Sequence, residues 1–360
     1  MKKNALFRFA LILLLLAACA LVLLIALPEE QPPAEPAVGS ETAPKEDGGL
    51  SILFIDVGQA DSMLLRCGGD AMLVDGGNVG DSDTIATVLG KQEDLDRLEY
   101  IVITHAHEDH AGGVPGALHA LPADHLMAPV TNKDRRYFQN LLKAAAERNL
   151  EIEVPKPGDV FTLGSATVEV LGPLKDYSET NNTSIILMVT YGETRFLLTG
   201  DMEADAEKDL VESGCNLDAD LLKVGHHGSG GSSSYVFLRA VTPEYAVIQC
   251  GEGNDYGHPH IEALSRLRDV GAKLYRNDMQ GDILVRSDGE TITVTTARNQ
   301  NIETYPTETA VPSFYIGNAA SKKFHRPDCS GLPSEDKRVR FDTRAEAVSA
   351  GYDACGICKP

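Results

Sequence analysis

The sequence has little positive charge and few cysteines, and each shortage excludes a class of protein. Its 360 residues hold 32 Lys and Arg against 53 Asp and Glu, a formal net charge of −21. This balance excludes broad electrostatic attraction to nucleic acid or anionic membrane, although a local cleft charged by metal stays compatible with it. The seven cysteines are scattered, and only Cys355 and Cys358 form a close pair, which excludes a disulfide scaffold.

The N-terminal residues 1–27 predict an export signal that stays in the membrane as an anchor. Three basic residues precede the uncharged run 10–27, whose 18 residues approach the ~20 needed to span a bilayer. Basic residues ahead of the run keep that end inside and send the remainder out. Residues 16–19 also resemble a lipoprotein cleavage box, which would leave Cys19 lipidated, but the apolar run continues past it. Either way, we expect an extracytoplasmic protein tethered to the cell membrane.

Composition divides the rest of the chain into four parts. Residues 28–49 are rich in Pro, Glu and Ala and predict a disordered spacer. Residues 50–297 alternate short apolar strands with amphipathic stretches, and their length suits one large domain. Residues 298–312 form a second polar linker, and residues 313–360 form a small separate module.

Hairpins early in the large domain, followed by strand–helix alternation, predict an α/β fold with two sheets and helices on their outer faces. Strands are expected over residues 51–57, 71–74, 100–104, 167–171, 184–190, 194–199, 220–224, 245–249, 273–276, 281–286 and 291–295. Helices are expected over residues 83–89, 114–120, 134–148, 202–213, 233–240 and 261–270.

The segment that follows the predicted strand 100–104 is the leading candidate for a metal site. It places His105, His107, Asp109 and His110 within six residues. Neutral imidazole and carboxylate ligands suit zinc and its first-row neighbours, whereas the alternative is a solvated histidine-rich turn. His105 and His107 alternate along an extended loop and can reach one metal. Asp109 and His110 can serve a second metal beside it, with Asp109 also acting in catalysis.

Residues farther along the chain complete this candidate site. Asp201 ends a predicted strand and can bridge two metals. His226 and His258 are predicted metal ligands, and with His227 they are the candidate proton donors to a leaving oxygen; the alternative for His227 is support of its loop. Metals about 3.5–4 Å apart lower the pKa of a shared water toward 7 and stabilise both oxygens of an in-line phosphoryl displacement.

Two neighbours of these histidines have less specific signals. Lys223 ends a buried strand, where it can pair with a phosphate or form a structural salt bridge. Ser229 begins a Gly/Ser loop with Gly230 and Gly231, whose backbone N–H groups can face an anion.

The segment HAHEDH at residues 105–110 fits the H-x-H-x-D-H signature of the metallo-β-lactamase superfamily, which the chain resembles over about residues 50–297. More narrowly, five segments in order resemble the extracellular nuclease-like domain of ComEC-type competence proteins. These segments are FIDVGQADS (54–62), ETNNTSIIL (179–187), LLTGD (197–201), LLKVGHHGS (221–229) and NDYGHPH (254–260). The resemblance implies a four-layer αββα sandwich, two divalent metals (zinc or manganese) and DNA as substrate.

The resemblance also implies roles for single residues. Asp75, in LVDGG, would brace the histidine loop, and Asp201 would bridge the metals. Asp56, Gln59 and Asp61 would line the substrate cleft, with capping of the strand end as the alternative for the first two.

The chain departs from the wider superfamily at one point. Many members place a third histidine on the first metal, ahead of the bridging aspartate, whereas this chain has Asn182 near that place. Because Asn offers only a neutral carbonyl oxygen, the choice between zinc and manganese stays open.

The C-terminal module resembles the metal-binding module of the Ada DNA-repair protein through its Tyr315-x-Gly-Asn, GYDAC and final Cys pair. His325, Cys329, Cys355 and Cys358 form a closed tetrahedral zinc set, and so short a module needs such a staple to fold. One Ada cysteine is replaced by His325, so the methyl-transfer chemistry does not carry over. Residues 322–344 hold seven basic and four acidic residues, which suits either a weak DNA-backbone contact or a purely structural cap.

Together these observations predict a membrane-anchored, extracytoplasmic metal-dependent hydrolase, a phosphodiesterase acting on DNA. Unlike a complete ComEC-type protein, the 360 residues hold no multi-helix channel. We therefore expect the protein to trim or scavenge external DNA, or to assist a separate DNA-uptake channel. Two alternatives are a hydrolase of the same fold acting on a lactone or β-lactam, and a catalytically silent DNA-binding surface protein. Oligomeric state is left open.

Overall fold

The computed structural model describes residues 48–305, 314–327, 329, 331–356 and 358. The predicted anchor (1–27), residues 28–47 of the spacer and residues 306–312 of the second linker lie outside this part of the chain. Within the described ranges, no helix combines the length and the apolar character needed to cross a membrane.

The first sheet has eight strands, antiparallel from β15 to β3 and parallel from β3 to β6. Its order is β15 (Ile292–Thr296), β14 (Ile283–Ser287), β1 (Leu50–Phe54), β2 (Met63–Cys67), β3 (Asp70–Val74), β4 (Leu98–Val102), β5 (Ala123–Met127) and β6 (Ile152–Glu153). Because C-terminal strands close the edge beside β1, residues near 290 are needed to complete the sheet that begins the domain.

The second sheet has seven strands, parallel from β13 to β10 and antiparallel from β10 to β7. Its order is β13 (Lys273–Arg276), β12 (Tyr245–Ile248), β11 (Leu221–Lys223), β10 (Thr194–Leu198), β9 (Ile186–Tyr191), β8 (Ala166–Gly172) and β7 (Val160–Leu163). Each sheet thus joins a hairpin half to a parallel half, and parallel strands require crossover connections that place helices on the sheet face.

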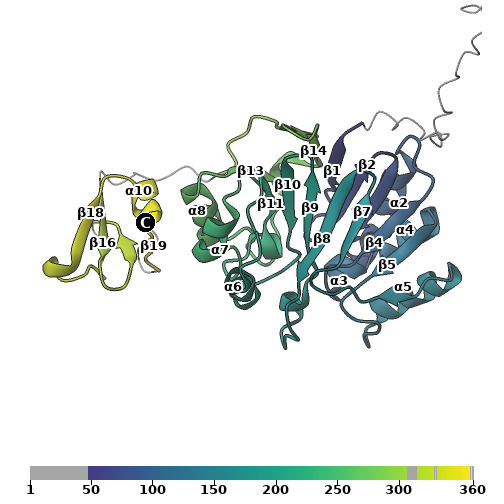
Figure 1. Ribbon diagram of the computed structural model, residues 1–360, viewed down its shortest axis with the longest axis horizontal. Helices are drawn as coiled ribbons and strands as arrows, with labels where there is room; N and C mark the ends of the chain where they lie inside the picture. The colour runs from purple at the N-terminus through teal and green to yellow at the C-terminus, as the bar shows by residue number, and fades with distance from the viewer. Residues whose placement is uncertain (1–47, 306–313, 328, 330, 357, 359–360) are drawn as a thin grey trace, which may run out of the picture. The chain divides into compact units, whose positions relative to one another are not determined.

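Helices cover the outer face of each sheet (Figure 1). On the first sheet these are α2 (Ser82–Gly90), α4 (Val114–Ala120) and α5 (Arg136–Glu147). On the second they are α6 (Ala204–Ser213), α7 (Tyr235–Val241) and α8 (Ile261–Asp269). The short helices are α3 (Glu108–Ala111), α9 (Asn277–Gln280), η1 (Val79–Asp81), η2 (Thr180–Thr183) and η3 (Gly225–Gly228). The predicted αββα sandwich is confirmed.

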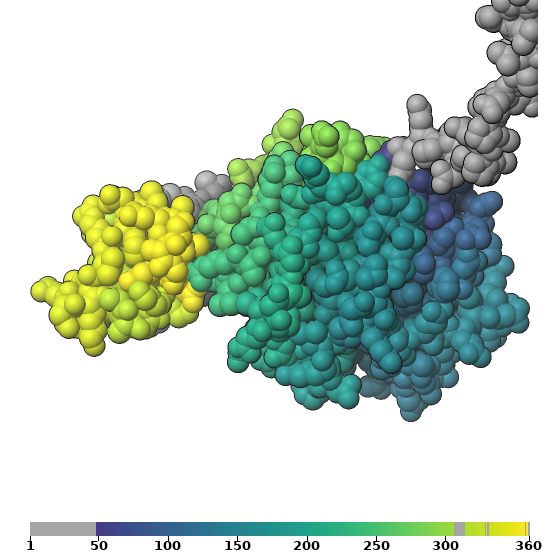
Figure 2. All heavy atoms as spheres, in the orientation of Figure 1, coloured from purple at the N-terminus to yellow at the C-terminus, as the bar shows by residue number. Residues whose placement is uncertain are grey.

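The central core lies between the two sheets. Strand β1 alternates buried and half-buried residues, so that Ile52 and Phe54 face Val168 and Phe196 of the other sheet across one apolar cluster. Each such side chain contributes about 1.5–3 kcal/mol when fully buried. On the face drawn in Figure 2, atoms of the first sheet with its helices and of the second sheet with its helices meet without a visible gap. This packing fixes the sheets against each other, and with them the loops at their ends.

Several elements were not predicted from the sequence. Strand β2 follows a polar loop and is buried on both faces, so it lacks alternation. Strand β5 contains Asp124 and His125, which mask its strand character, and β6 and β7 are short and largely exposed. Helix α3 has only four residues, too few for a helical period.

The C-terminal residues form a third, four-stranded sheet. Its order is β18 (Arg338–Phe341), β16 (Tyr315–Asn318), β17 (Lys323–His325) and β19 (Asp353–Ala354), with η4 (Glu335–Lys337) and helix α10 (Arg344–Ser349) beside it. Its small core includes Tyr315, Phe324 and Phe341. A core with so few large apolar side chains needs a bound metal ion or a comparable cross-link to be stable.

Candidate metal centre

The polar residues of interest lie in loops beyond the carboxyl ends of the parallel strands. Asp75 follows β3, the loop 103–110 follows β4, Asp201 follows β10, and residues 225–228 follow β11. Ligand sites of sheets with parallel strands form at this edge, because the loops there converge. The fold therefore gathers segments that are far apart in the sequence.

Four side chains form a compact ligand group: Asp109, His110, Asp201 and His227, whose ligand atoms all lie within 4.8 Å of one another. Oδ2 of Asp201 lies 3.3 Å from Nε2 of His110 and 3.5 Å from Nε2 of His227. Oδ2 of Asp109 lies 3.2 Å from Nε2 of His227. Two carboxylates and two imidazoles at this spacing suit one divalent cation of the first transition row.

A second set of histidines, His105 and His107, lies beside this group, with the rings of His105 and His110 4.1 Å apart between centroids. Nε2 of His105 is 2.9 Å from Nδ1 of His107 and 3.9 Å from Oδ2 of Asp201. The same carboxylate oxygen thus faces both histidine sets, which is the position of a bridging ligand. Oδ1 of Asp201 is buried and has no hydrogen-bond partner among the described residues. The donor set and this orphaned oxygen fit a pair of metal ions.

Asp75 holds the loop 103–110 in place through hydrogen bonds. Its backbone is left-handed (φ 58°), and its carboxylate accepts hydrogen bonds from the backbone N–H and the hydroxyl of Thr104 at 2.7 and 2.8 Å. The same carboxylate lies 2.8 Å from Nδ1 of His110. An N–H on Nδ1 leaves the lone pair of Nε2 pointing at Asp201. A carboxylate behind a ligating imidazole fixes its tautomer and orientation in this way.

His227 is oriented from behind by a backbone carbonyl. Its Nδ1 donates to the carbonyl oxygen of Gln249 at 2.9 Å, which turns Nε2 toward Asp109 and Asp201. The Gln249 side chain donates to the carbonyls of Ile55 and Ser62, both at 3.0 Å. Gln249 therefore links the His227 loop to the strand edge of the first sheet.

Lys223 forms the structural salt bridge that was one of its two predicted alternatives. Its ammonium lies 2.6 Å from Oδ2 of Asp61, and neither side chain is exposed. Oδ1 of Asp61 lies 3.2 Å from Nδ1 of His227. The Lys223 ammonium is fully buried, so it is not exposed to a substrate phosphate. Asp61 likewise supports His227 rather than lining a cleft.

The backbone turns left-handed at three successive residues: φ is 49° at His226, 53° at His227 and 82° at Gly228. This turn sends the two histidine side chains in different directions. Nδ1 of His226 lies 3.0 Å from Oε1 of Glu203, and its Nε2 stays 3.9 Å from Asp201. With its side chain 25% exposed, His226 lies at the rim, outside the group of four.

Helix η2 contains Asn182, the residue compared above with a third histidine ligand. The side chain of Asn182 is turned away from the metals, since its Oδ1 accepts the backbone N–H of Glu203 at 2.9 Å. Asn181 is the residue that approaches the site, with its Nδ2 3.1 Å from Glu203 and 3.4 Å from Nδ1 of His226. The first metal position therefore has fewer protein ligands than the second.

The buried charges of the site favour the binding of a cation. Burial, reinforced by the neighbouring His110, holds the pKa of His105 well below its usual value, so this imidazole stays neutral. Burial alone would lower the pKa of His227 too, but the carboxylates of Asp201 and Asp61 raise it well above the ordinary range. The buried carboxylates thus require positive charge beside them, which a proton or a bound divalent metal can supply.

The remaining predicted residues lie around this centre. His258 is outside the group of four, and its Nδ1 is 3.3 Å from the side-chain nitrogen of Gln59. Asp56 lies at the strand end, where it accepts the N–H of Gly58 at 3.4 Å and pairs with Arg298 at 3.6 Å. Gln59 thus borders the site, whereas Asp56 takes the capping alternative.

The loop after His227 does not offer its N–H groups to an anion, which corrects that expectation. The N–H groups of Ser229, Gly230 and Gly231 donate to the His226 carbonyl, the His260 ring and the Ser229 hydroxyl, at 2.7, 2.9 and 3.2 Å. All three donors are used to hold the loop itself.

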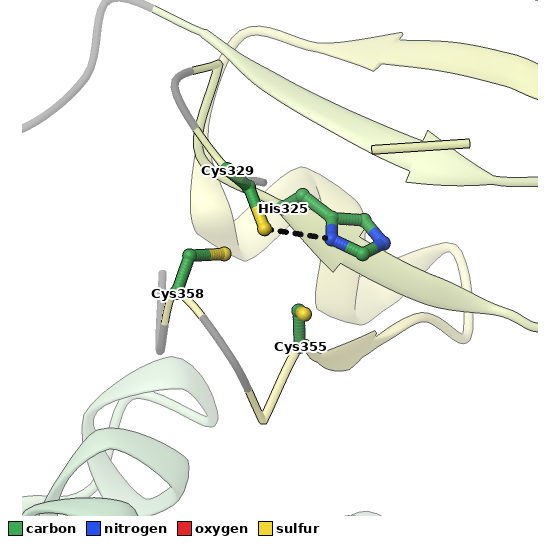
Figure 3. A group of neighbouring side chains, drawn as sticks. All are labelled: His325, Cys329, Cys355 and Cys358. Carbon is green, nitrogen blue, oxygen red and sulfur yellow. Dashed lines mark hydrogen bonds between the residues drawn. The ribbon is translucent and has the colours of Figure 1, made fainter. Parts of the chain in front are cut away.

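The C-terminal module holds a separate ligand group. His325, Cys329, Cys355 and Cys358 point toward one another, and their ligand atoms lie within 4.8 Å (Figure 3). Backbone N–H groups of Arg326 and Gly331 donate to the sulfurs of Cys358 and Cys329, both at 3.3 Å. One imidazole and three sulfurs, closed off from further ligands, fit a structural metal ion.

Sequence reasoning missed two supporting residues, Glu203 and Gln249. Neither stands in a ligand motif, and each acts through a contact that only the folded chain creates. One weak signal was present for Glu203, because it follows the segment LLTGD, which ends at Asp201, by two residues.

Comparisons with known proteins agree with this geometry. The family profile of the metallo-beta-lactamase superfamily matches residues 55–252, and that of the metal binding domain of Ada matches residues 306–360. ComE operon protein 3 of Bacillus subtilis is 31% identical over 253 residues, which cover 65% of this chain and 32% of that protein. Competence protein ComA of Neisseria gonorrhoeae is 31% identical over 246 residues, which cover 67% and 32%. The chain thus spans about a third of the length of these relatives.

Among solved structures, the metallo-beta-lactamase fold protein YhfI from Bacillus subtilis aligns with a TM-score of 0.43 at 14% identity, over 63% of this chain and 96% of that one. The predicted resemblance to competence proteins is confirmed by the two sequence relatives. The superfamily profile covers more than half of the chain, from Ile55, directly after β1, to Glu252 in the loop beyond Gln249. The chain therefore belongs to the metallo-β-lactamase superfamily, with an Ada-type metal-binding domain at its C-terminal end.

Proposed function

We propose that this protein is a membrane-anchored, extracytoplasmic, metal-dependent phosphodiesterase that cleaves DNA in a competence or DNA-scavenging setting. The observation that carries the proposal is the group Asp109, His110, Asp201 and His227, with His105 and His107 across the shared Asp201 oxygen. A relative at 31% identity that is named a competence protein, ComA of Neisseria gonorrhoeae, supports DNA as the substrate.

Two divalent ions, zinc or manganese, would supply Lewis acidity at this site and neutralise the charge of a phosphodiester. His105, His107 and Asp201 would hold the first ion; Asp109, His110, His227 and the shared Asp201 would hold the second. With no third histidine, the first ion would have oxygen and water partners beside His105 and His107, which favours manganese. The closed His/Cys set of the C-terminal module would hold a structural zinc.

His226 is the residue best placed to protonate the leaving oxygen. It is partly exposed at the rim, and Glu203 holds its Nδ1 at 3.0 Å. This contact aims Nε2 toward the space beside Asp201. A general acid needs both a defined orientation and access to the reacting atom, and His226 has both.

We expect two basic side chains, Lys133 and Arg135, to contact an anionic polymer despite the net charge of −21. Besides burial, the charge of Lys133 lowers the pKa of His107. Lys133 is half-buried and the neighbouring Arg135 is exposed, so both can reach a DNA backbone that passes the site.

The test uses the full-length protein in detergent, loaded in turn with manganese, zinc or neither. Cleavage of end-labelled DNA with added metal, abolished by chelator, is the expected result. A β-lactam and a lactone are assayed in parallel, and hydrolysis of either one with DNA left intact would overturn the proposal. DNA that is bound in a gel shift and stays uncut with every metal would instead favour a silent binding protein. Protease treatment of intact cells tests the location, with loss of the hydrolase domain expected.

A further inference from the structure

The loop between β12 and α8 presents an aromatic ring to solvent close to the metal centre. Tyr256 is 69% exposed, the largest value among the large apolar side chains in the described part of the chain. A single exposed apolar side chain is common on protein surfaces. What distinguishes Tyr256 is that its ring stacks on His258 next to the ligand group.

The loop that carries Tyr256 is held rigidly from within. Oδ1 of Asn254 accepts the N–H groups of Tyr256 and His258 at 3.1 and 3.0 Å, and its Nδ2 donates to the carbonyls of Gly251 and His258 at 2.9 and 2.6 Å. Nδ1 of His260 accepts the N–H of Gly230 at 2.9 Å. Its Nε2 therefore carries the hydrogen, which it donates to the Tyr256 carbonyl at 3.1 Å. Tyr256 is thus presented on a preorganised support.

Three rings form a stepped row from the metal centre to solvent. His258 stacks on His227 with centroids 6.3 Å apart and planes inclined by 27°. Tyr256 stacks on His258 with centroids 5.7 Å apart and planes inclined by 22°. Because His227 belongs to the ligand group, the outer ring lies only two ring steps from a metal ligand. The free face of Tyr256 continues this row outward.

The ligand that fits this row is flat, aromatic and attached to the group that the metals bind. In a nucleic acid, the base of a nucleotide flanking the scissile phosphate is joined to that phosphate by one sugar. Every base has a π-face, so stacking on an aromatic side chain is strong and tolerant of sequence. Inside a duplex, both faces of each base are covered by its neighbours, and only an unpaired or terminal base can stack on a protein ring.

We propose that Tyr256 is a stacking platform for an unpaired base next to the scissile phosphate, which makes single-stranded DNA, or the frayed end of a strand, the substrate class of this site. The proposal rests on the proposed function and adds the state of the strand that is cut. Tyr256 is a binding residue here, and the chemistry stays with the metal ligands and His226.

The first experiment compares single-stranded and duplex DNA of one sequence, using metal-loaded full-length protein in detergent. Wild type is expected to cleave the single strand with a kcat/KM about 10-fold or more above that for the duplex interior. Tyr256→Ala is expected to lose about 10- to 100-fold on the single strand, mainly through KM, and Tyr256→Phe to keep most activity. Val160→Ala, which removes another exposed apolar side chain, is the matched control and should behave as wild type.

The second experiment locates the stacked base. An abasic residue is moved one position at a time along the single strand. Wild type is expected to lose activity when the abasic residue flanks the cleavage position, and Tyr256→Ala to lose no further activity there.

The outcomes separate this proposal from the one it rests on. If wild type cleaves DNA but Tyr256→Ala matches it on single strands, or the abasic scan is flat, the stacking role is overturned and the nuclease stands. Equal cleavage of single strand and duplex interior likewise overturns the substrate class. If wild type cleaves no DNA with any metal, the proposed function falls first.

Discussion

Lys223 and Asp61 form an ion pair of 2.6 Å in which neither side chain reaches solvent. The pair joins the second sheet to the loop between β1 and β2 in the first. Asp61 also lies 3.2 Å from Nδ1 of His227, so the pair bears directly on a metal ligand. A buried charge pair costs desolvation on both sides, and its best-attested use is to fix a structure in register. Here the pair fixes the loop that carries His227 relative to Asp109.

Removing one partner of this pair should lower the stability of the domain. Lys223→Met is expected to lower the free energy of unfolding by about 3–5 kcal/mol, because it removes the lysine that compensates the buried charge of Asp61. Urea unfolding followed by circular dichroism measures the loss. The double variant Lys223→Met/Asp61→Leu should be more stable than the single one, and equal stability of the two would contradict the pairing. Lys208→Met, at an exposed surface pair, is the control.

The bridging position of Asp201 predicts a coupled loss of both hydrolase metals. Asp201→Asn should weaken metal binding by more than the ~10–100-fold that loss of an outer partner costs, and should abolish cleavage. Metal analysis and the nuclease assay are the measurements, with circular dichroism to show that the fold persists. His107→Ala should remove the first metal preferentially. The control Asp205→Asn alters an exposed carboxylate nearby, and full activity in Asp201→Asn would refute the site.

The two metal centres should load independently. Cys355→Ser is expected to lower the zinc content by one equivalent and to expose the C-terminal module to protease, since the sulfur set staples that small core. The hydrolase metals should remain. Zinc release monitored with a chromogenic chelator separates the two pools. Cys215→Ser serves as the control because its thiol is outside both groups. Unchanged zinc in Cys355→Ser would rule out the proposed ligand set.

The stability of the segment that follows His226 and His227 should depend on pH through Glu207. Its carboxylate accepts the N–H groups of Ser233 and Ser234, and burial raises its pKa above the usual value. A raised folded-state pKa means that the folded protein binds the proton more tightly than the unfolded chain. The contribution of protonated Glu207 to the free energy of unfolding is therefore fully present below pH ~4.5. It is lost as the pH rises through the pKa of Glu207 in the folded protein.

The corresponding measurement compares Glu207→Gln with wild type in urea unfolding between pH 4.5 and 8. The amide side chain of the variant has no charge to bury, so wild type should lose more stability over this window than the variant does. The difference between the two proteins should then shift in favour of the variant at higher pH. A difference that stays constant with pH would show that Glu207 does not titrate in this range. Glu212→Gln, at an exposed pair, is the control.

The sequence predicted the fold where local pattern and tertiary role agree. Helix α4 and strand β13 have the predicted bounds, because their apolar spacing matches the face that they bury. Strand β5 escaped prediction because its polar residues face the exposed end of the strand. Pairing of β14 with β1 joins opposite ends of the domain, and no local signal encodes such a contact.

The metal site was predictable to the extent that ligands repeat at short spacing. The cluster from His105 to His110 occupies one loop, so its chemistry is visible in the sequence. The choice among the later histidines was not visible there. It depends on the left-handed turn at His226 and His227, which sends only the second ring into the ligand group. Backbone conformation of that kind is set by the packed environment.

That left-handed turn has a consequence for engineering the protein. A non-glycine residue in this conformation costs roughly 1–2 kcal/mol, and two such residues follow each other here. Glycine at position 226 would relieve part of this cost and would remove the proposed proton donor. Glycine at position 227 would also remove the hydrogen bond to Gln249 and leave the buried Asp201 without that imidazole. Screens for thermal resistance would therefore favour inactive variants at position 226, a trade between stability and turnover.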